Sequence, residues 1–513
     1  MLLWHYMSEE PQTTEKGISR RQFLKVAAVG AGAGVLGKMG VDALLSSEGE
    51  LKEVDLSNYV DTEGIGTTFN YEELVKDGFA RELTPEEGEG FVFEGVRLDC
   101  TNLSGREIRL APTLIDRIAQ SNVSKEDYDS GAGWVPGVVG LYMINSEIIN
   151  NSNENPVFSF DGDRVIHAVG GKNRLQNIGV TLKKDDWRSE HRVTPSAISG
   201  ENCELELKSV SIGYETRDSS GLNPIGDGEA QVRQISQFAR GVILQNTKDE
   251  NYSNLKIDSS DIQSFPWDAV VTTGKTHISA INVSATQNEA TKNRGAFLAA
   301  VRNGSVAKVE VVSDSTQVVS YGKGIWNLVD LSQRSEYTDA ELIVDGIRIN
   351  TAQWALQAEP GQKVNIKNMT CIVDSENESL VPIERAASDE AWLGVTGLLE
   401  LKYGSEVSLD NFKVEVEQSV PDNSTILLAT ADDARSIRSK DRTVFRVKTK
   451  SGENLISPSF SRMMGVVESQ AARQGMEYSG FGSKVFFDTA ENRFGIVVTL
   501  SKGEERVRAV VRF

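Results

Sequence analysis

A six-residue pattern of apolar and polar positions returns nine times between residues 93 and 414. Its first, fourth and sixth positions are mostly apolar, and its second and fifth are mostly polar. The third is Asn or Gly in six copies: Gly95, Asn177, Asn254, Gly346, Asn368 and Asn411. Because Asn and Gly tolerate a left-handed backbone, the pattern predicts a strand, a turn at the third position, and a second strand.

The copies are FEGVRL (93–98), LQNIGV (175–180), LKSVSI (207–212), YSNLKI (252–257), ISAINV (278–283), VAKVEV (306–311), VDGIRI (344–349), IKNMTC (366–371) and LDNFKV (409–414).

A second series of short apolar segments has a nearly constant spacing. The segments GVIL, DAVV, GAFL, GIWN and AQWA align Ile243, Val270, Phe297, Trp326 and Trp354, with Leu399 as a candidate for the next position. The separations of 27, 27, 29 and 28 residues indicate stacked units of several short strands, without a helical period. The sequence therefore predicts an all-β protein, a right-handed parallel β-helix with a short N-terminal cap and a C-terminal β-hairpin unit.

The two tryptophans of this series have two interpretations. Leu328 and Leu356 stand two positions after Trp326 and Trp354, and polar Gln353 and Gln357 alternate with them. Alternation along a strand therefore predicts that these rings point into the core. The alternative is an outward aromatic platform for a sugar.

Charge and cysteine content limit the classes of partner. The formal net charge is −20, which offers no basic stripe for the phosphates of a nucleic acid and repels a polyanion unless a cation intervenes. Cys100, Cys203 and Cys371 show no metal-ligand spacing, so no structural metal site is predicted. Cys371 occupies an inward position of its repeat and is expected to be a buried free thiol.

Residues near the N-terminus carry a targeting motif. Arg20 and Arg21 are followed by Phe23 and Leu24 and then by a weakly apolar, glycine-rich segment from Val26 to about Leu45. This segment resembles a twin-arginine export signal, which implies passage of a folded protein through the twin-arginine translocase to the cell surface or medium. A membrane span of about 20 strongly apolar residues is disfavoured by the glycines and Lys38.

These features divide the chain into five parts. We expect a signal segment over 1–45, an acidic linker over 46–88, an N-terminal cap and first coil over 89–160, the β-helix over 161–418, and a β-rich cap over 419–513. Within the first cap, the spacing of Leu114, Ile115 and Ile118 suggests a short helix. A second helix is expected within 454–475, followed by strands over 484–494 and 495–513.

An exported β-helix resembles the pectate-lyase-like superfamily, and the acidic composition resembles secreted proteins of halophilic archaea. The first resemblance rests on the repeat between about residues 90 and 416 and implies a fold rather than a reaction. Polygalacturonases of this superfamily carry a G-H-G and an R-I-K motif. Here no histidine stands in G-H-G, and Arg348-Ile349-Asn350 lacks the lysine. That class is disfavoured, and the catalytic residues, if any, stay unidentified.

A lyase would need a base, and calcium or arginine to neutralise a uronate carboxylate. The nearest set of suitable residues is Asp258, Asp261, Asp268, Lys275 and His277, which a coil of about 27 residues would distribute over different faces. Trp187 and His191, in a polar insert, are a second candidate cleft wall. For both sets a solvated charged surface is the competing interpretation.

Two functions therefore stay open. One is binding or degradation of an extracellular or cell-surface polysaccharide, and the other is a non-enzymatic role as a surface or appendage rod, including a virus-encoded spike. Sequons such as those at Asn102, Asn282 and Asn368 add the possibility of a glycoprotein.

Overall fold

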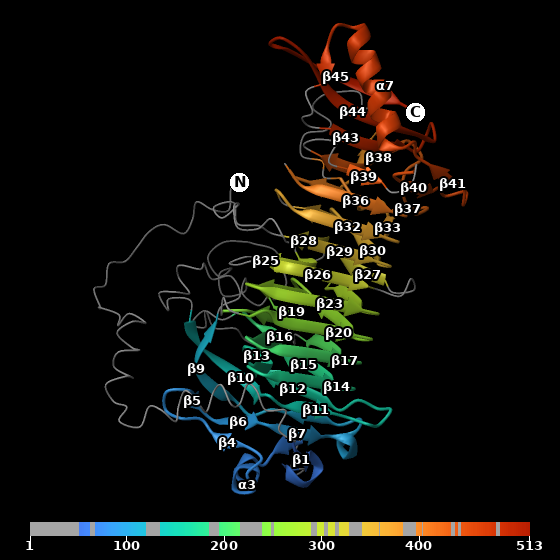
Figure 1. The fold of residues 1–513 in the computed structure, drawn as a ribbon. Helices are drawn as coiled ribbons and strands as arrows, with labels where there is room; N and C mark the ends of the chain where they lie inside the picture. Colours follow the sequence, from blue (N-terminus) through green and yellow to red (C-terminus); the bar gives the residue numbers. More distant parts are fainter. Residues whose placement is uncertain are drawn as a thin grey trace, which may run out of the picture.

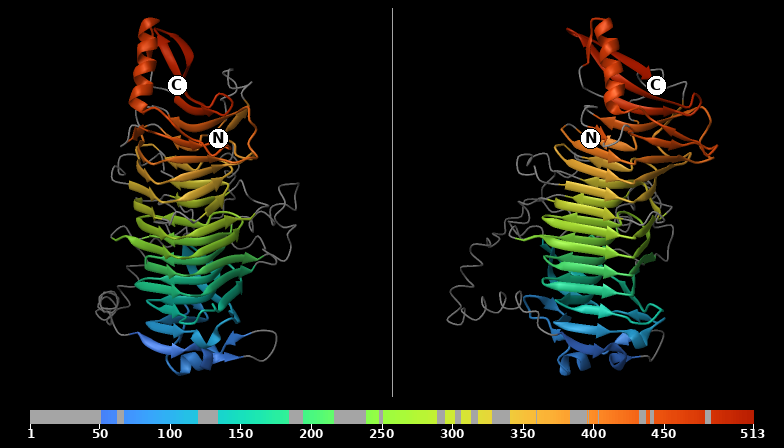
Figure 2. Two further views of the ribbon diagram at one scale, coloured as in Figure 1. Left: turned by 90° about the vertical axis from the view of Figure 1, so that its right-hand side faces the viewer. Right: turned by 45° about the vertical axis from the view of Figure 1, so that its right-hand side comes forward.

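The chain winds repeatedly through three sheets, and successive coils stack along one axis (Figures 1 and 2). The computed structural model describes residues 51–61, 67–119, 134–183, 194–215, 239–247, 251–288, 295–301, 306–312, 318–327, 341–358, 360–382, 395, 397–402, 404–431, 437–439, 443–478 and 483–513. Within one coil, for example, β13 lies in the third sheet, β14 in the first and β15 in the second. The predicted all-β parallel β-helix is confirmed.

The first sheet contains, in spatial order, β1 (Lys52–Asp55), β7 (Val96–Asp99), β11 (Glu147–Ile149), β14 (Lys172–Gln176), β17 (Glu204–Lys208), β20 (Ser253–Asp258), β23 (Thr276–Ile281), β26 (Val306–Val312), β29 (Glu341–Asp345), β32 (Lys363–Lys367), β36 (Glu406–Asp410) and β39 (Ile437–Ser439).

The second sheet contains β8 (Glu107–Arg109), β12 (Val157–Asp161), β15 (Gly179–Lys183), β18 (Ser211–Glu215), β21 (Asp261–Phe265), β24 (Ser284–Gln287), β27 (Val318–Tyr321), β30 (Arg348–Thr351), β33 (Thr370–Val373), β37 (Lys413–Val416), β40 (Arg446–Lys448) and, antiparallel to β40, β41 (Asn454–Ile456).

The parallel part of the third sheet contains β6 (Phe91–Glu94), β10 (Trp134–Ile144), β13 (Arg164–Val169), β16 (Ser196–Glu201), β19 (Arg240–Gln245), β22 (Val270–Thr273), β25 (Ala296–Val301), β28 (Lys323–Asn327), β31 (Leu356–Ala358), β35 (Leu399–Leu401) and β38 (Ser424–Ala431). Antiparallel strands extend it at both ends: β4 (Arg81–Glu82), β5 (Gly88–Glu89), β9 (Thr113–Ala119), β34 (Leu380–Pro382), β42 (Glu477–Tyr478), β43 (Ser483–Asp488), β44 (Arg493–Lys502) and β45 (Glu505–Arg512).

Columns of apolar side chains fill the interior. In the first sheet, the strand register aligns Leu175 with Leu207, and Leu207 with Ile257. All three are fully buried. Neighbouring coils place such residues about 4.8 Å apart, so each apolar side chain contacts the ones above and below it.

The corner between the first and second sheets is built from residues with a positive φ. Asn177 (φ 53°), Asn368 (φ 48°) and Asn411 (φ 60°) turn the chain there, as predicted. The backbone N–H of Asn368 donates to the carbonyl of Asp410 in the next coil (2.9 Å), and its side chain accepts from Asn411 (2.9 Å). The corner therefore fixes the height at which each coil joins the next.

Two residues at the third position of the predicted repeat do not lie at this corner. Asn254 lies within β20, and the turn comes five residues later at Ser259 (φ 50°), so the prediction for Asn254 is wrong. Gly95 (φ 66°) does turn, but between β6 and β7, at the corner of the third and first sheets. The mistake at Asn254 arises because alternation within a strand produces the same apolar spacing as the turn pattern, whereas the predicted turn at Gly95 is confirmed.

The predicted column of Ile243, Val270, Phe297, Trp326 and Trp354 is also one residue out of register. The inward column aligns Val242, Val270, Leu298, Ile325 and Leu356. Ile243, Val271, Ala299 and Trp326 align in the adjacent, outward column and form a separate apolar cluster with Ala296.

The three aromatic rings therefore have different environments. Phe297 is buried in the main core, as predicted, while Trp326 is half-buried on the outer face. Trp354 is buried, with its ring 5.9 Å from that of Trp326.

The N-terminal end is more ordered in structure than the sequence predicts. The expected linker over 46–88 is wrong for its described residues, which form β1, η1 (Leu56–Tyr59), β2 (Val60–Asp61), β3 (Thr68–Phe69) and α3 (Tyr71–Lys76). Leu56 and Leu74 are fully buried in the main core. Because β1 pairs with β7 in parallel, the stack already begins at Lys52.

The helix expected around Leu114, Ile115 and Ile118 is also wrong. These residues belong to β9, which pairs antiparallel with β10. Ile115 and Ile118 pack with Val139 of β10, so these apolar side chains stabilise the pairing of β9 with the third sheet. The 3-10 helix η2 (Thr101–Leu103) is the only helical element that the structure describes between residues 89 and 160.

The C-terminal cap agrees with the sequence. Helix α7 (Phe460–Arg473) begins at Ser459, whose side chain accepts from the N–H of Arg462, and it buries Met463, Val467 and Ala471 along one face. The strands β43, β44 and β45 form the predicted hairpins, with Asn492 and Gly503 at positive φ in the two turns.

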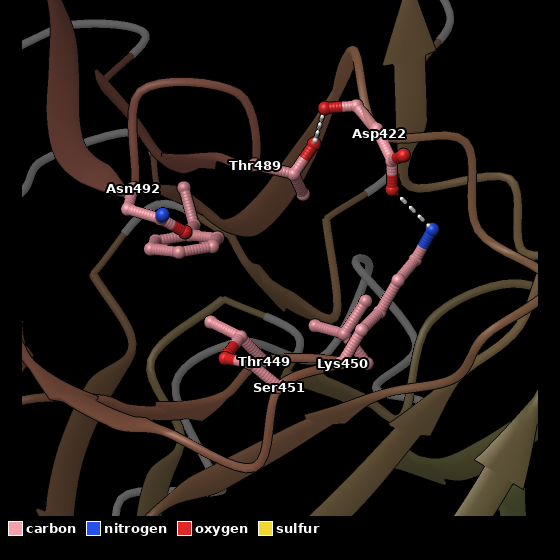
Figure 3. A pocket seen from close by; sticks show the side chains of 8 residues that line it. Asp422, Thr449, Lys450, Ser451, Thr489 and Asn492 are labelled. Carbon is pink, nitrogen blue, oxygen red and sulfur yellow. Dashed lines mark hydrogen bonds and ion pairs between the residues drawn. The ribbon is translucent and has the colours of Figure 1, made fainter.

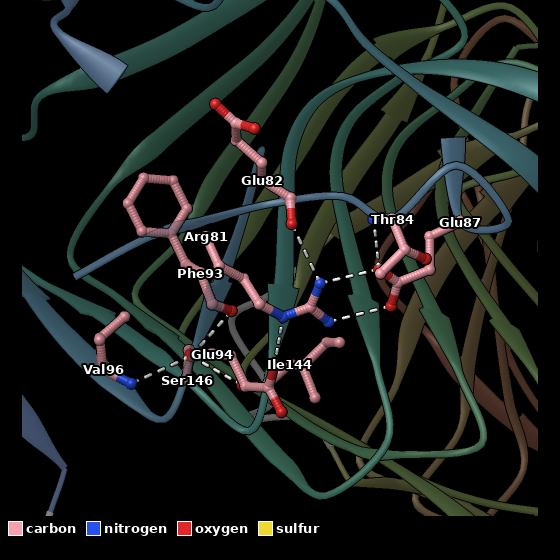
Figure 4. A network of polar contacts seen from close by, with 9 residues as sticks. All are labelled: Arg81, Glu82, Thr84, Glu87, Phe93, Glu94, Val96, Ile144 and Ser146. Atoms are coloured by element: carbon pink, nitrogen blue, oxygen red, sulfur yellow. Dashed lines mark hydrogen bonds and ion pairs between the residues drawn. The ribbon is translucent and has the colours of Figure 1, made fainter. Parts of the chain in front are cut away.

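A half-buried ion-pair network secures the first coil (Figure 4). Arg81 donates to both carboxylate oxygens of Glu87 (2.8 and 2.9 Å) and to Glu94 (2.8 Å). Beside it, the N–H of Val96 donates to the hydroxyl of Ser146 (3.2 Å), which itself donates to the carbonyl of Ile144 (2.8 Å). The hydrogen bonds from Arg81 lower the pKa of Glu87 to about 2.

Two glycine substitutions should have opposite effects on stability. A Cβ would meet no atom within 4 Å at either Gly95 or Gly465, but only Gly95 has a positive φ. We expect Gly95→Ala to lower the free energy of unfolding by about 1 kcal/mol, and Gly465→Ala, inside α7, to raise it by about 0.5–1 kcal/mol. Chemical denaturation checks both, and Gly95→Asn is the control that should cost less than alanine.

Acid should act on the Arg81 network in a defined pH window. The folded pKa of Glu87 lies below its usual value of 4.5, so this carboxylate stabilises the fold above pH 4.5 and loses that contribution as the pH falls towards 2. The thermal stability of Glu87→Gln should therefore lie below that of the wild type at neutral pH and converge with it on acidification. The exposed neighbour Glu86→Gln is the control, and a difference that grows with acidification would contradict the assignment.

Candidate functional site

The outward face of the second sheet carries a charged cluster near its C-terminal end. In β30, β33, β37 and β40 the positions in the core are Ile349, Cys371, Val414 and Val447. Because successive residues of a strand face opposite sides, their neighbours point outward. The register aligns these in two columns: Arg348, Thr370, Lys413 and Arg446, and beside them Asn350, Ile372, Glu415 and Lys448.

Two adjoining cavities lie at this cluster. The larger, of about 420 Å³, is lined by residues that include Arg348, Glu415, Glu417 and Lys448. The smaller, of about 190 Å³, reaches towards the C-terminal cap and is lined by residues that include Asp422, Phe487, Thr489 and Asn492 (Figure 3). Both are lined by Val416, Thr449 and Lys450, and we call them together the C-terminal groove.

Glu415 is held between two cations in this groove. Its carboxylate accepts from Arg348 Nη2 (2.7 Å) and from Lys413 Nζ (2.8 Å). Burial raises the pKa of Glu415, but these two hydrogen bonds outweigh it, and the pKa is lowered overall. Glu415 is therefore an ionised carboxylate at neutral pH, and its place suits the positioning of Arg348 and Lys413 rather than proton donation.

Other cations in the groove or beside it are accessible to a ligand. Within the described part of the chain, no ion-pair partner lies within reach of Lys448 or of the exposed Arg446. Lys450 contacts Asp422 (2.6 Å), whose side chain is 93% exposed, so this pair is weak and open to exchange.

The C-terminal cap fixes the far wall of the groove. Thr489, directly after β43, accepts from the N–H of Ser424 (3.0 Å) and donates to the carbonyl of Asp422 (3.0 Å; Figure 3). These contacts hold the turn that precedes β38 against the β43–β44 turn. The groove is therefore formed jointly by the last coils and the cap.

The first predicted cleft residues do not converge on one site. Asp258 and Asp261 stand on either side of the Ser259 corner, between the first and second sheets. Lys275 and His277 follow Gly274, whose φ of 80° marks the corner of the third and first sheets. This distribution agrees with the expectation that one coil would separate them. Trp187 and His191 lie outside the described residues.

The contacts of Asp268 indicate a structural role. It is buried, pairs with Arg240 (3.1 Å) and accepts from the N–H of Ala296 (2.8 Å), which ties three neighbouring coils together. Burial raises its pKa, with Arg240 opposing that shift. His277 stacks on the partly exposed Tyr252, with ring centroids 4.5 Å apart.

The outward face of the third sheet contains a buried polar network that sequence reasoning missed. His167 contacts the Ser199 hydroxyl (2.7 Å), stacks on Tyr142, and lies 3.4 Å from the guanidinium of Arg164. Arg164 also donates to the carbonyl of Ala119 (3.0 Å). Burial, and then Arg164, lower the pKa of His167 well below its usual value, so the ring is neutral. With His167 and Ser199 each 1% exposed, this network joins β9, β13 and β16 rather than facing a ligand.

The cysteines and the possible metal ligands complete the description of the reactive side chains. Cys100, Cys203 and Cys371 are buried free thiols, as expected for Cys371, and burial raises the pKa of each. Within the described ranges, no group of three or more His, Cys, Asp or Glu residues is arranged to hold a metal ion. No helix in the same ranges is long and apolar enough to cross a membrane.

Comparison with known proteins identifies the targeting segment. Residues 17–37 match the twin-arginine translocation pathway signal sequence. No curated protein matches the chain. The N-terminus therefore directs export across the membrane through the twin-arginine translocase, as Arg20, Arg21, Phe23 and Leu24 predict.

Export should depend on the two arginines and not on charge alone. Replacing Arg20 and Arg21 by Lys preserves charge but removes the planar guanidinium groups, and we expect the precursor to stay inside the cell. Immunoblots of cell and medium fractions measure this, with Lys25→Arg as the control. Unchanged secretion of the double variant would contradict the assigned role.

Proposed function

We propose that this exported β-helix binds an acidic extracellular or cell-surface polysaccharide in the C-terminal groove. The observation that carries the proposal is a set of four cations on one face of the second sheet: Arg348 on β30, Lys413 on β37, and Arg446 and Lys448 on β40. Rungs repeat about every 4.8 Å along the stack, so the backbone positions of these cations span only about 15 Å along it. Uronate carboxylates or sulfates along a glycan chain would present a matching series of negative charges.

The chemistry of the groove favours binding over cleavage. The carboxylate of Glu415 forms ion pairs with Arg348 and Lys413. It is therefore poorly suited to donate a proton to a glycosidic oxygen. Lys448 and Arg446 can contact an anion without leaving a buried partner unpaired, because no described residue holds them in an ion pair. Hydroxyl and amide groups of Thr449, Ser419 and Gln418 supply further polar contacts on the same wall.

The wider features of the chain support this proposal. The resemblance to the pectate-lyase-like superfamily suggests an extracellular glycan as the ligand, and export places the protein where such a glycan occurs. The net charge of −20 fits secretion into the saline surroundings of a halophilic archaeon.

The sequence also predicted an alternative, a structural rod in a surface or appendage assembly. One observation favours it as a second candidate. The C-terminal cap contains more basic than acidic residues, while the rest of the chain is strongly acidic. Such a division of charge along a rod suits assembly with partners at its ends.

The binding proposal is tested with two substitutions, at Lys448 in the groove and at Arg446 beside it on the same strand. The double variant Lys448→Gln and Arg446→Gln should bind a polyuronate or sulfated glycan at least about tenfold more weakly, the factor that corresponds to about 1.4 kcal/mol. Affinity electrophoresis or calorimetry measures the change against acidic and neutral glycans.

Lys363→Gln, on the exposed face of the first sheet, is the matched control and should bind like the wild type. Equal binding by all variants, or a preference for neutral glycans, would contradict the groove as the binding site. Incubation with the bound glycan should yield neither unsaturated products nor new reducing ends.

A further inference from the structure

The two ends of the stack carry opposite charge. Residues 419–513 contain 15 Lys and Arg against 11 Asp and Glu, a net charge of +4, so residues 1–418 carry −24 of the total of −20. Residues 51–100, whose described part builds the N-terminal end of the stack, contain 13 Asp and Glu against 4 Lys and Arg. The described parts of these two regions lie at opposite ends of the stack (Figures 1 and 2).

Most of the acidic groups at the N-terminal end point into solvent. Eight carboxylates of the described residues in the first coil are exposed: Glu53, Asp61, Glu72, Glu73, Asp77, Glu82, Glu86 and Glu89. Only two cations, Lys52 and Lys76, are exposed in the same residues. Arg81 does not offset this surface because Glu87 and Glu94 already neutralise it.

The opposite end presents a basic face on its last strand. Arg506, Arg508 and Arg512 alternate along β45, so they share one face of the sheet, which also carries the partly exposed Val510. Their partners on β44 are uncharged (Ser501, Thr499 and Gly495), and Arg512 also forms a solvent-exposed ion pair with Glu491 of the β43–β44 turn (3.7 Å). Lys484 of β43 lies on this face as well, since Lys484 aligns with Val497 and Val497 with Val510. We call this surface the arginine face.

The arginine face is crowded with like charge and borders an open strand edge. The pKa of Lys484 is lowered by burial and further by Arg508, with Glu400 opposing both, so the cations are close enough to interact. Among the described strands, β45 pairs with β44 alone, and Val507 and Val510 are 40% and 44% exposed. A long, partly apolar edge strand is a common site of contact with another chain.

We propose that a second copy of this chain places its acidic first coil against the arginine face of β45, so that copies join head to tail. Charge complementarity selects this occupant. Side-by-side contact would bring two acidic flanks together and is repelled, whereas end-to-end contact brings opposite charges together. The interface is heterologous, because the two surfaces differ, and repetition of it yields linear chains rather than a closed dimer.

Charge reversal at each end tests the proposal with the full-length exported protein. At about 0.15 M salt, where the Debye length is about 8 Å, sedimentation velocity should show a concentration-dependent series of oligomers, and electron microscopy should show linear chains. Arg506→Glu with Arg508→Glu should weaken association at least tenfold, and Glu72→Arg with Glu82→Arg should do the same.

Two controls separate docking from general effects of charge and folding. Lys208→Glu with Lys363→Glu makes the same change in net charge on the flank of the first sheet and should leave association unchanged. The Arg506→Glu, Arg508→Glu variant retains an acidic end, so added to wild type it should shorten the chains, which an unfolded variant would not do.

Several results would overturn the proposal. These are a wild type that stays monomeric at every concentration, association that stops at a dimer, and charge-reversed variants of either end that associate like the wild type. Loss of glycan binding by the Lys448 and Arg446 variant leaves this assembly untouched, so the two proposals fail independently.

Discussion

Every feature of this molecule depends on the turn residues that join each coil to the next at a constant height. At the corner of the first and second sheets, the chain adopts a positive φ at Asn177, Asn368 and Asn411. The N–H of the turning residue bonds to the next coil, as Asn368 does to Asp410. If one coil were displaced by a single residue, its apolar side chains would face solvent and its polar ones the core. The corner hydrogen bonds therefore maintain the register on which the interior columns depend.

The same register explains how much of the fold could be predicted from sequence. The repeat identifies stacked coils because Asn and Gly recur where a left-handed turn is needed. It does not locate every turn, since YSNLKI has the right spacing of apolar residues while Asn254 stands inside β20. The tryptophan column fails for a related reason: an apolar cluster of Ile243, Val271 and Trp326 covers the outer face of the third sheet, so hydrophobicity there does not indicate the core. Leu114 and Ile118 likewise fit a helical spacing while serving an antiparallel strand pair.

The candidate groove could not be predicted from local sequence. Arg348, Glu415 and Lys448 belong to three different coils, and only the pairing of β30, β33, β37 and β40 brings them onto one face. The candidate set around Asp258 and His277 is compact in sequence but divided between two corners. In a solenoid, residues close in sequence lie at different positions around one coil. Residues about one coil length apart lie on neighbouring rungs of the same face. A search for sites in such a chain therefore has to compare outward positions one coil apart.

The distribution of charge follows from the same one-dimensional architecture. Each coil contacts only its neighbours, so charge on one coil affects stability locally and can vary along the axis without disturbing the rest. The flanks and first coil can thus be strongly acidic, which favours solubility of the exported protein. The last strands, by contrast, carry cations in and beside the groove and on β45. Contacts between neighbouring coils also form from segments close in sequence, which favours folding before export. The two ends of the described stack therefore differ in charge before the protein reaches the twin-arginine translocase, which is the property on which both proposals depend.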